Sequence, residues 1–343
     1  MAVVKADGYG HGMESAARAA LFGGAGWLGV ATAQEALTLR AAGLSAPLLC
    51  WLGPPGGDAT ELIRANVQVT VSAQWRLAEV LDAAGRLGRP VDVQLKVDTG
   101  LGRGGAPPGE LPALVEAIAA AVQGGSARLT GVWSHLACSE VADHPANDEQ
   151  NAGLLAAVEV VRAAGLDPGV VHLANSGAAL ARPDLHHDLV RVGLALYGYS
   201  PLPPAVPSPV ALRPAMTLRS RLAGVKAVPG GHHVSYGWTW TAPRDTTLGL
   251  VPIGYADGIL RAFSPGAEVF VGGRRAPLVG AVCMDQFVVD LGPQAHDQPG
   301  DDVVLFGADP DGLGVPSADD WARAAGTISW EVLTLPRGRI TRR

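Results

Sequence analysis

Short apolar segments alternate with longer amphipathic segments along residues 1–200. Stretches rich in Ala, Leu, Arg and Glu have helical character and include Met13–Phe22, Ala33–Ala42, Pro112–Gln123 and Asn147–Ala164. The apolar, β-branched runs start near Val3, Trp27, Pro47, Val67, Val91, Leu129, Val170 and Leu189. Strands that alternate with helices are typical of a parallel sheet, and eight strands close a (β/α)8 barrel. The pattern therefore predicts an α/β fold with a TIM-like barrel over residues 1–200.

The pattern changes after a proline-rich stretch. Six prolines fall within residues 201–214. Because such a stretch can continue neither a helix nor a central strand, it predicts a domain linker. Strand-like runs separated by Gly, Pro and Asp follow at Thr217–Val228, Thr246–Ile253, Glu268–Val271, Leu278–Val282, Phe287–Leu291 and Asp302–Phe306, with one helix expected around Ser317–Ala325. We expect a mainly β C-terminal domain over residues 215–343.

The helices of the predicted barrel do not balance its strands. The eight runs enclose only seven intervening segments, and the last strand, Leu189–Val192, leads into the prolines. We expect the eighth covering helix to come from residues upstream of Met1.

Composition narrows the class of protein. Hydrophobic residues make up 48% and charged residues 17% of the chain, as in globular proteins. The net charge of −6 provides no basic surface for nucleic acid or acidic membranes. No apolar run approaches the ~18 residues that span a bilayer, and Lys5 and Asp7 interrupt the start, so it does not resemble a signal peptide. Three scattered cysteines suit reduced thiols. We expect a cytoplasmic protein.

Chemically capable residues lie at the ends of the predicted barrel strands, where catalytic side chains gather in such folds. Lys5 follows the first apolar run, and a lysine at the edge of a desolvated pocket can form a Schiff base. A solvated strand-end lysine is the alternative. Arg191 lies within an apolar run, where a guanidinium is unfavourable unless it is paired. His135 and His172 are also at strand ends, where most lone histidines are structural.

The segment AVVKADGYGHG around Lys5 resembles the cofactor-lysine motif of the alanine racemases. Further motifs follow in that family's order, namely LKVDTGLGR, SHL, HLANS, VRVGLALYG, VSYG, PIGYADG and VCMDQ. The resemblance covers essentially the whole chain. It implies an isomerase that uses pyridoxal 5′-phosphate to interconvert L- and D-alanine, supplies D-alanine for peptidoglycan, and needs no metal.

The resemblance also implies cofactor contacts. Lys5 would carry the cofactor, His135 would stack on its ring, and Arg191, supported by His172, would face the pyridine nitrogen. Because guanidinium keeps its proton, the ring would be a weaker electron sink than one paired with a carboxylate, which favours reprotonation at Cα. The remaining contacts, mostly to the phosphate, would be Tyr9, Asn175, Ser176, Gly193, Leu194 and Trp330.

Racemisation needs a base on each face of the reacting carbon. Lys5 is tethered to one side and cannot serve both faces, and the resemblance implies that it acts on D-alanine. The resemblance implies that Tyr236 acts on L-alanine, with His135 near it. A turn tyrosine that packs its ring is the alternative for Tyr236.

The substrate contacts implied by the resemblance are Arg103, Tyr255 and the backbone N–H of Met284. Lys96 would be carbamylated and would bridge to Arg103, whereas an ordinary ion pair with Asp98 is the alternative. Because the family builds part of this site from the partner subunit, the resemblance implies a homodimer.

The chain departs from the family pattern at three places. Trp330 stands where tyrosine is usual, and its indole N–H has a different reach from a phenol. Only four residues precede Lys5, where family members carry a longer segment, so we expect the chain as given to be less stable than a longer one. The tail Arg337–Arg343 lacks the proline that many members have before the last arginine.

Two other classes compete with a racemase. A non-catalytic barrel that carries vitamin B6 would lack a second domain with a base, so Tyr236 and the Cys283-Met284-Asp285 segment argue against it. A barrel-type decarboxylase would pair the ring nitrogen with a carboxylate, so Arg191 argues against that class.

Overall fold

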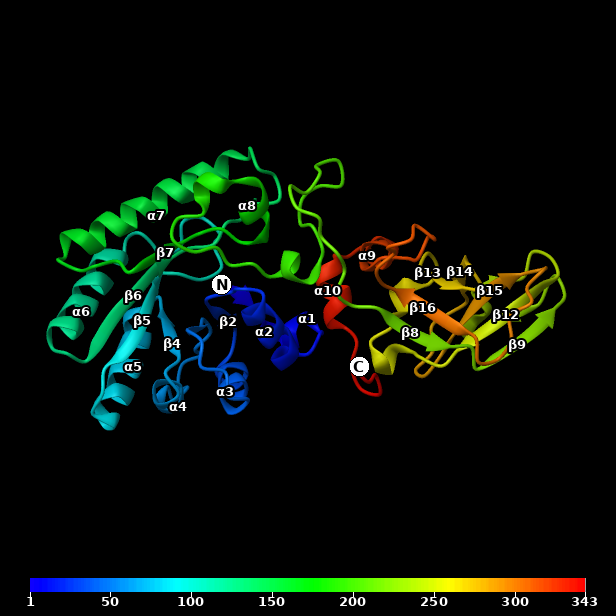
Figure 1. Ribbon diagram of the computed structural model, residues 1–343, viewed down its shortest axis with the longest axis horizontal. Helices are drawn as coiled ribbons and strands as arrows, with labels where there is room; N and C mark the ends of the chain where they lie inside the picture. Colours follow the sequence, from blue (N-terminus) through cyan, green and yellow to red (C-terminus); the bar gives the residue numbers. More distant parts are fainter. Residues whose placement is uncertain (343) are drawn as a thin grey trace. The chain divides into compact units, whose positions relative to one another are not determined.

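The computed structural model describes residues 1–342. These residues form two compact units, one made of Met1–Gly8 and Gly12–Leu212, the other of Tyr9–His11 and the chain from Arg213 onward. Figure 1 labels the helices and strands of both.

A seven-stranded parallel sheet forms the centre of the first unit, and its strands are ordered as in the sequence. The sheet curls, and helices cover its outer face, as in a TIM-like barrel (Figure 1). The predicted α/β class is therefore confirmed. The strands are β1 (Ala2–Val3), β2 (Leu28–Val30), β3 (Leu48–Cys50), β4 (Gln68–Val71), β5 (Val91–Lys96), β6 (Ala127–Trp133) and β7 (Val170–His172).

The predicted eighth strand, Leu189–Val192, is not a regular strand. Val192 forms an isolated parallel bridge with Ala2 and accepts a hydrogen bond from the Val3 N–H at 2.8 Å. On the other side, the Arg191 backbone N–H donates to the Ala174 carbonyl at 2.9 Å. The expectation of eight regular strands was wrong by one, because this segment shares its few backbone bonds between two neighbours instead of forming a ladder with either.

Sequence signals define the ends of the helices. Thr32 begins α3 with a capping box, in which its hydroxyl accepts the Glu35 N–H at 3.3 Å and the Glu35 carboxylate accepts the Thr32 N–H at 3.0 Å. Gly88 ends α5 in the left-handed conformation that favours glycine. The helices are α1 (Lys5–Tyr9), α2 (Met13–Phe22), α3 (Ala33–Ala41), α4 (Thr60–Arg64), α5 (Gln74–Leu87), α6 (Leu111–Gln123), α7 (Pro145–Ala163) and α8 (Ser176–Ala181).

Apolar side chains of the strands and of the inner helix faces form one buried core. Leu28, Leu48 and Leu95 from the sheet and Leu39 and Ile118 from the helices are inaccessible to solvent. Full burial of such a side chain contributes about 1.5–3 kcal/mol. This core holds the strand ends in place.

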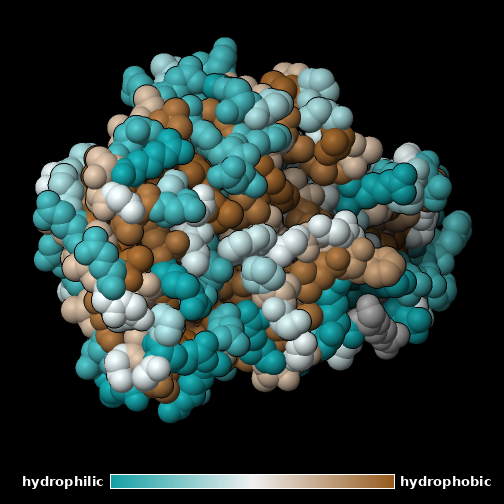
Figure 2. Space-filling view, turned by 60° about the vertical axis from the view of Figure 1, so that its left-hand side comes forward, coloured by the Kyte–Doolittle hydropathy of each residue, from teal (hydrophilic) through white to brown (hydrophobic). Residues whose placement is uncertain are grey.

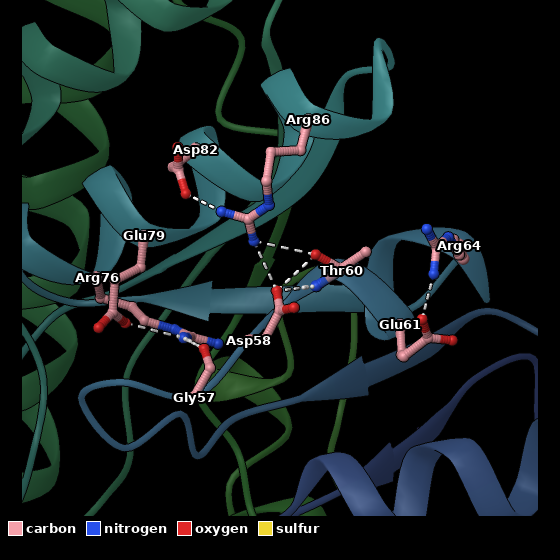
Figure 3. Close-up of polar contacts among 9 residues, drawn as sticks. All are labelled: Gly57, Asp58, Thr60, Glu61, Arg64, Arg76, Glu79, Asp82 and Arg86. Carbon is pink, nitrogen blue, oxygen red and sulfur yellow. Dashed lines mark hydrogen bonds and ion pairs between the residues drawn. The ribbon is translucent and has the colours of Figure 1, made fainter.

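Polar contacts with α5 hold the loop between β3 and α4 (Figure 3). The Asp58 carboxylate accepts the Thr60 N–H at the start of α4 at 2.9 Å and a guanidinium N–H of Arg86 on α5 at 2.9 Å. Arg76 is buried beneath the loop and pairs with Glu79 at 3.2 Å. A Cβ at Gly53 would lie 2.4 Å from the Arg76 guanidinium carbon, so the backbone passes directly over this side chain. The loop that follows Trp51 is therefore held by α5.

The second unit contains an antiparallel seven-stranded sheet in the order β8-β16-β13-β14-β15-β12-β9. This confirms the predicted mainly β character of the C-terminal part. The strands are β8 (Leu218–Arg221), β9 (Gly224–Val228), β12 (Thr246–Val251), β13 (Glu268–Val271), β14 (Arg274–Val279), β15 (Phe287–Gly292) and β16 (Asp302–Phe306), beside a small hairpin of β10 (His233–Val234) and β11 (Trp240–Thr241).

Two details differ from the sequence-based expectation. The run Thr217–Val228 is not one strand, because β8 and β9 lie at opposite edges of the sheet. The helix expected near Ser317–Ala325 is α9 (Ala318–Ala325), capped by Ser317, and an unexpected helix, α10 (Ser329–Thr334), follows it.

The face of the molecule in Figure 2 mixes hydrophilic and apolar residues. Within residues 1–342, no helix is long and apolar enough to cross a membrane.

Candidate active site

Lys5 lies just beyond the end of β1, where the chain enters a left-handed turn. Ala6, Asp7, Gly8 and Tyr9 all have φ between 52° and 63°. Non-glycine residues rarely adopt this conformation, which costs roughly 1–2 kcal/mol for each. Hydrogen bonds hold the turn, since the Ala6 N–H donates to Glu35 at 2.7 Å and the Asp7 carboxylate accepts the Met13 N–H at 2.9 Å. The strained turn fixes the direction in which Lys5 leaves the barrel.

The ammonium of Lys5 is in an unfavourable environment. Burial lowers the pKa of Lys5, the nearby Arg103 lowers it further, and Glu35 only partly opposes them. The Lys5 Nζ lies 5.8 Å from the centre of the Trp51 ring. A larger fraction of neutral amine, which is the nucleophilic form, follows from this environment.

Two tryptophans connect the strand ends. The rings of Trp51 and Trp133 meet edge to face, with their centroids 6.5 Å apart. Lys96 Nζ and Arg191 Cζ each lie 4.9 Å from the centre of the Trp133 ring. Because the face of an indole attracts cations, Trp133 helps to hold two cationic groups close together. Neither tryptophan was predicted as a site residue, although Trp51 directly follows a buried strand and Trp133 is the last residue of one.

Arg191 is buried to 4% exposure, and its hydrogen bonds within residues 1–342 go to neutral acceptors. Its Nη1 donates to His172 Nδ1 at 2.9 Å, and its Nη2 donates to the carbonyls of Ser134 at 2.7 Å and Leu173 at 2.9 Å. Nη2 also lies 3.2 Å from His135 Nδ1. Burial lowers the pKa of Arg191 to about 9, which still leaves the guanidinium protonated at neutral pH.

A chain of hydrogen bonds through the barrel interior orients His172. Because His172 Nδ1 accepts from Arg191, its Nε2 carries the proton and donates to Gln94 Oε1 at 2.8 Å. Gln94 Nε2 then donates to Gln68 Oε1 at 2.8 Å, and Thr130 donates to the same oxygen at 2.9 Å. Sequence reasoning missed Gln94. A glutamine in the middle of the buried run VDVQLK was the available signal, since a buried polar side chain needs partners.

His135 and His172 are both neutral groups here. Burial and then the Arg191 charge lower the pKa of each well below the usual value. The structure therefore brings together His135, His172 and Arg191, as the sequence analysis expected, and gives the histidines the state in which they accept hydrogen bonds from the guanidinium.

Lys96 lies close enough to Arg103 and Arg191 for their charges to act on its amine. Burial, followed by the charges of Arg103 and Arg191, lowers the pKa of Lys96 to about 8. The Arg103 side chain is exposed. The alternative considered for Lys96, an ion pair with Asp98, is not among the salt bridges of residues 1–342, although the charge of Asp98 does act to raise the Lys96 pKa.

A cradle of N–H groups follows Arg191. The buried Ser176 hydroxyl accepts the Gly193 N–H at 3.0 Å and the Ala195 N–H at 3.3 Å. Asn175 caps α8 by accepting the Gly177 N–H at 3.1 Å. The structure thus places the predicted residues Asn175, Ser176, Gly193 and Leu194 beside one another.

In the second unit, three loops bring Tyr236, Tyr255 and Met284 together. The Ser235 hydroxyl donates to the Ala281 carbonyl at 2.6 Å, which joins the Tyr236 turn to the Met284 loop. The Tyr255 N–H donates to the Cys283 carbonyl at 3.0 Å. Tyr236, Tyr255 and Met284 are 75%, 37% and 53% exposed. Three predicted site residues of the second unit are therefore exposed beside one another.

Tyr9 and Trp330 also belong to the second unit. A Cβ at Gly10 would lie 2.1 Å from the Leu333 carbonyl of α10, and Arg342 donates to the Gly10 carbonyl at 3.0 Å. The segment with Tyr9 therefore packs against the helix with the half-buried Trp330. Burial raises the pKa of Tyr9 to about 12, so its hydroxyl keeps its proton.

Comparisons with known proteins give a consistent result. The family model "Alanine racemase, N-terminal domain" matches residues 1–201, and "Alanine racemase, C-terminal domain" matches residues 215–343. Alanine racemases of Mycolicibacterium vanbaalenii and Thermobifida fusca are each 52% identical over 343 residues, which is 100% of this chain and 87% and 90% of theirs. The structure of alanine racemase from Streptomyces coelicolor A3(2) has a TM-score of 0.96 and 50% identity, covering 100% of this chain and 90% of that one.

Proposed function

The chain belongs to the alanine racemase family, whose members interconvert the enantiomers of alanine, and we propose that it does so with pyridoxal 5′-phosphate and two bases, Lys5 and Tyr236. The observation that carries the proposal is the concentration of Lys5, Lys96 and Arg191 around the tryptophan pair Trp51 and Trp133. Across residues 1–342, no salt bridge joins any of these three to a carboxylate. Such an uncompensated cluster suits an anionic cofactor and substrate.

The donors of the first unit fit the cofactor. Arg191 Nη1 carries two N–H groups, and His172 takes one, so the second is available for a ring nitrogen. The Ser176 oxygen accepts the Gly193 N–H, which leaves the Ser176 O–H to donate to a phosphate beside this run of backbone N–H groups. Lys5 would hold the cofactor aldehyde through its amine, and His135 would contact the face of the ring. The further contacts that we propose are Tyr9, Asn175, Leu194 and Trp330.

Two bases would divide the proton transfers. When bound, pyridoxal phosphate withdraws electrons from the Cα of an attached amino acid and so acidifies the Cα proton. Lys5 Nζ would remove this proton from D-alanine, and Tyr236 Oη would give a proton to the opposite face of Cα, which yields L-alanine. In the reverse direction Tyr236 would take the proton from L-alanine, and Lys5 would give one to the other face. One group on each face is the minimum for inversion without rotation of the substrate.

Arg191 would limit side reactions. Its guanidinium stays protonated, so it can donate a hydrogen bond to a ring nitrogen without transferring its proton to it. His172 and Gln94 hold its plane in place. A protein that holds the ring nitrogen in this way keeps electron withdrawal moderate, which favours returning the proton to Cα.

The substrate carboxylate would be bound by Arg103 and the Met284 N–H, with Tyr255 lining the entrance. We propose a homodimer in which each subunit completes its partner's site with Tyr236, Tyr255 and Met284, whose exposure supports this role. We also propose that residues 1–200 and 215–343 are separate domains joined by residues 201–214, and that the enzyme supplies D-alanine for peptidoglycan in the cytoplasm.

A direct assay tests the proposed function. Purified protein saturated with pyridoxal phosphate should convert L-alanine to a racemic mixture, as measured by chiral chromatography, and should release no carbon dioxide. Release of carbon dioxide would favour the decarboxylase class. Absence of both reactions, despite bound cofactor, would favour a non-catalytic carrier.

We expect Lys96 to be carbamylated in a pH-dependent manner. The neutral Nζ would attack carbon dioxide, form an N–C bond and lose one proton, so that a cation becomes an anion next to Arg103. At pH 7 an amine with a pKa of about 8 is neutral in about a tenth of molecules, against about one in a few thousand for an ordinary lysine. Carbamylation should therefore rise as the pH is raised through about 8.

Carbon-13 NMR with labelled bicarbonate measures this reaction. A carbamate signal should be present in the wild type and in Lys226→Arg, whose lysine is exposed on β9, and absent in Lys96→Arg. A signal that survives in Lys96→Arg would assign the modification to another amine.

A further inference from the structure

Arg339 joins the two loops that carry Tyr255 and Met284. Its Nε and Nη2 donate to the two carboxylate oxygens of Asp257 at 2.8 and 2.7 Å. Its Nη1 donates to Asp285, the residue after Met284, at 2.8 Å. One planar guanidinium therefore connects three segments of the second unit.

The Asp257 end of this connection is buried. Asp257 is only 2% exposed, and its carboxylate also accepts the Gly254 N–H at 3.0 Å. Burial acts to raise the pKa of Asp257, but Arg339 and the Gly254 N–H outweigh it, so the pKa lies below its usual value. A charged, bidentate pair of this kind is geometrically specific.

The backbone around the pair leaves little freedom. A Cβ at Gly254 would lie 2.3 Å from the Met284 carbonyl, and one at Gly258 would lie 2.1 Å from the Leu335 carbonyl. The Ala256 N–H donates to the Met284 carbonyl at 3.0 Å, and the Arg337 N–H donates to the Asp257 carbonyl at 3.1 Å. The tail and both loops are in direct backbone contact, so a shift of one would move the others.

We propose that Arg339 is a positioning residue that fixes the Met284 N–H relative to Tyr255, and thereby sets the affinity for the substrate carboxylate. The inference rests on the proposed function for the roles of Tyr255 and Met284. Arg339 touches neither substrate nor cofactor in this scheme. It acts through Asp257, which anchors the Tyr255 loop, and through Asp285, which anchors the Met284 loop.

The chain provides a matched control. Arg275 also bridges two carboxylates of the second unit, Glu268 at 3.3 Å and Asp320 at 3.2 Å, and it lies on β14 and not on these loops. Arg275→Gln should lose a similar set of ion pairs without moving Tyr255 or Met284.

Kinetics of the alanine reaction separate positioning from general destabilisation. Arg339→Gln should raise the KM for alanine about 10- to 100-fold, as expected when a binding group is displaced by about 1 Å. The kcat should change much less, because a carboxylate contact is present in both the ground and the transition state. Asp285→Ala should raise KM in the same direction, and Asp285→Asn, which keeps an acceptor oxygen, should restore much of the loss. A KM in Arg339→Gln equal to that of Arg275→Gln would overturn the proposal.

Hydrogen exchange measured by mass spectrometry gives a readout that does not depend on activity. In Arg339→Gln, the amides of residues 254–258 and 283–285 should exchange faster than in the wild type, whereas Arg275→Gln should leave them unchanged. Uniformly faster exchange throughout the second unit would overturn the positioning role. If the wild type fails to racemise alanine, the proposed function fails, but the exchange result still decides whether Arg339 holds these loops.

Discussion

Lys5→Ala is expected to abolish alanine racemisation, with a residual rate below about 10⁻⁴ of the wild type, because one change removes both the covalent attachment and a base. The lowered pKa of Lys5 favours the neutral, nucleophilic amine, since burial and Arg103 disfavour its charged form. Racemisation rates by chiral chromatography at saturating pyridoxal phosphate measure the loss.

Attachment can be checked independently of activity. The chain has only three lysines, Lys5, Lys96 and Lys226. Borohydride reduction of the wild type loaded with cofactor, followed by peptide mapping, should place the label on Lys5. Lys226→Arg should keep full activity and the same label. A label on Lys96, whose pKa is also lowered, would contradict the assignment.

The physics of the residues alone does not distinguish Lys5 from Lys96. Both are partly buried, both have a lowered pKa, and each has its amine near a tryptophan ring. What separates them is position, since Lys5 follows β1 and enters the strained left-handed turn, whereas Lys96 is the last residue of β5. The family motif around Lys5 made this choice in the sequence analysis, where composition and periodicity could not.

The local pattern of apolar and polar residues was enough to predict most of the helices and strands. Helix α2 was predicted as Met13–Phe22 and has those bounds, because its apolar spacing is intrinsic to the segment. The split of Thr217–Val228 was not predictable, since both halves alternate like a strand and only their partners, β16 and β12, separate them to opposite edges. The prediction of a regular strand at Leu189–Val192 was also wrong, because the number of backbone hydrogen bonds that this segment makes depends on how the barrel closes and not on its own residues.

The sequence indicates a site residue where a charged side chain lies within an apolar run. Arg191 is such a residue, and the fold buries it. Its supporting network was only partly found, because Gln68 and Gln94 lie 26 residues apart and become partners only when β4 and β5 pair. The left-handed conformation of Ala6 and Asp7 could not be read from residue type, since the contacts that stabilise it include Glu35 in another helix.

Tyr236→Phe is expected to lower the alanine racemisation rate by about 10²–10⁴-fold, the usual effect of losing a positioned acid–base group. The structure supports a presenting role, because Tyr236 is exposed on a turn where Ser235, Gly237 and Trp238 have φ of 65°, 71° and 49°. For Ser235 and Trp238, which are not glycine, this conformation is strained and persists where the surroundings hold it, and here the Ser235 hydroxyl donates to the Ala281 carbonyl.

The two directions of the reaction give this prediction its sharpest form. Because the enantiomers have equal free energy in water, kcat/KM must fall equally from L-alanine and from D-alanine. Exchange of the Cα proton with deuterated water need not fall equally. Lys5 remains intact in Tyr236→Phe, so D-alanine should still exchange its Cα proton with retention of configuration, whereas L-alanine should not. Trp238→Phe, which alters an exposed aromatic side chain in the same turn, should keep both exchange and racemisation. Continued exchange of L-alanine in Tyr236→Phe would mean that another group is the second base, and that Tyr236 serves only to pack the turn.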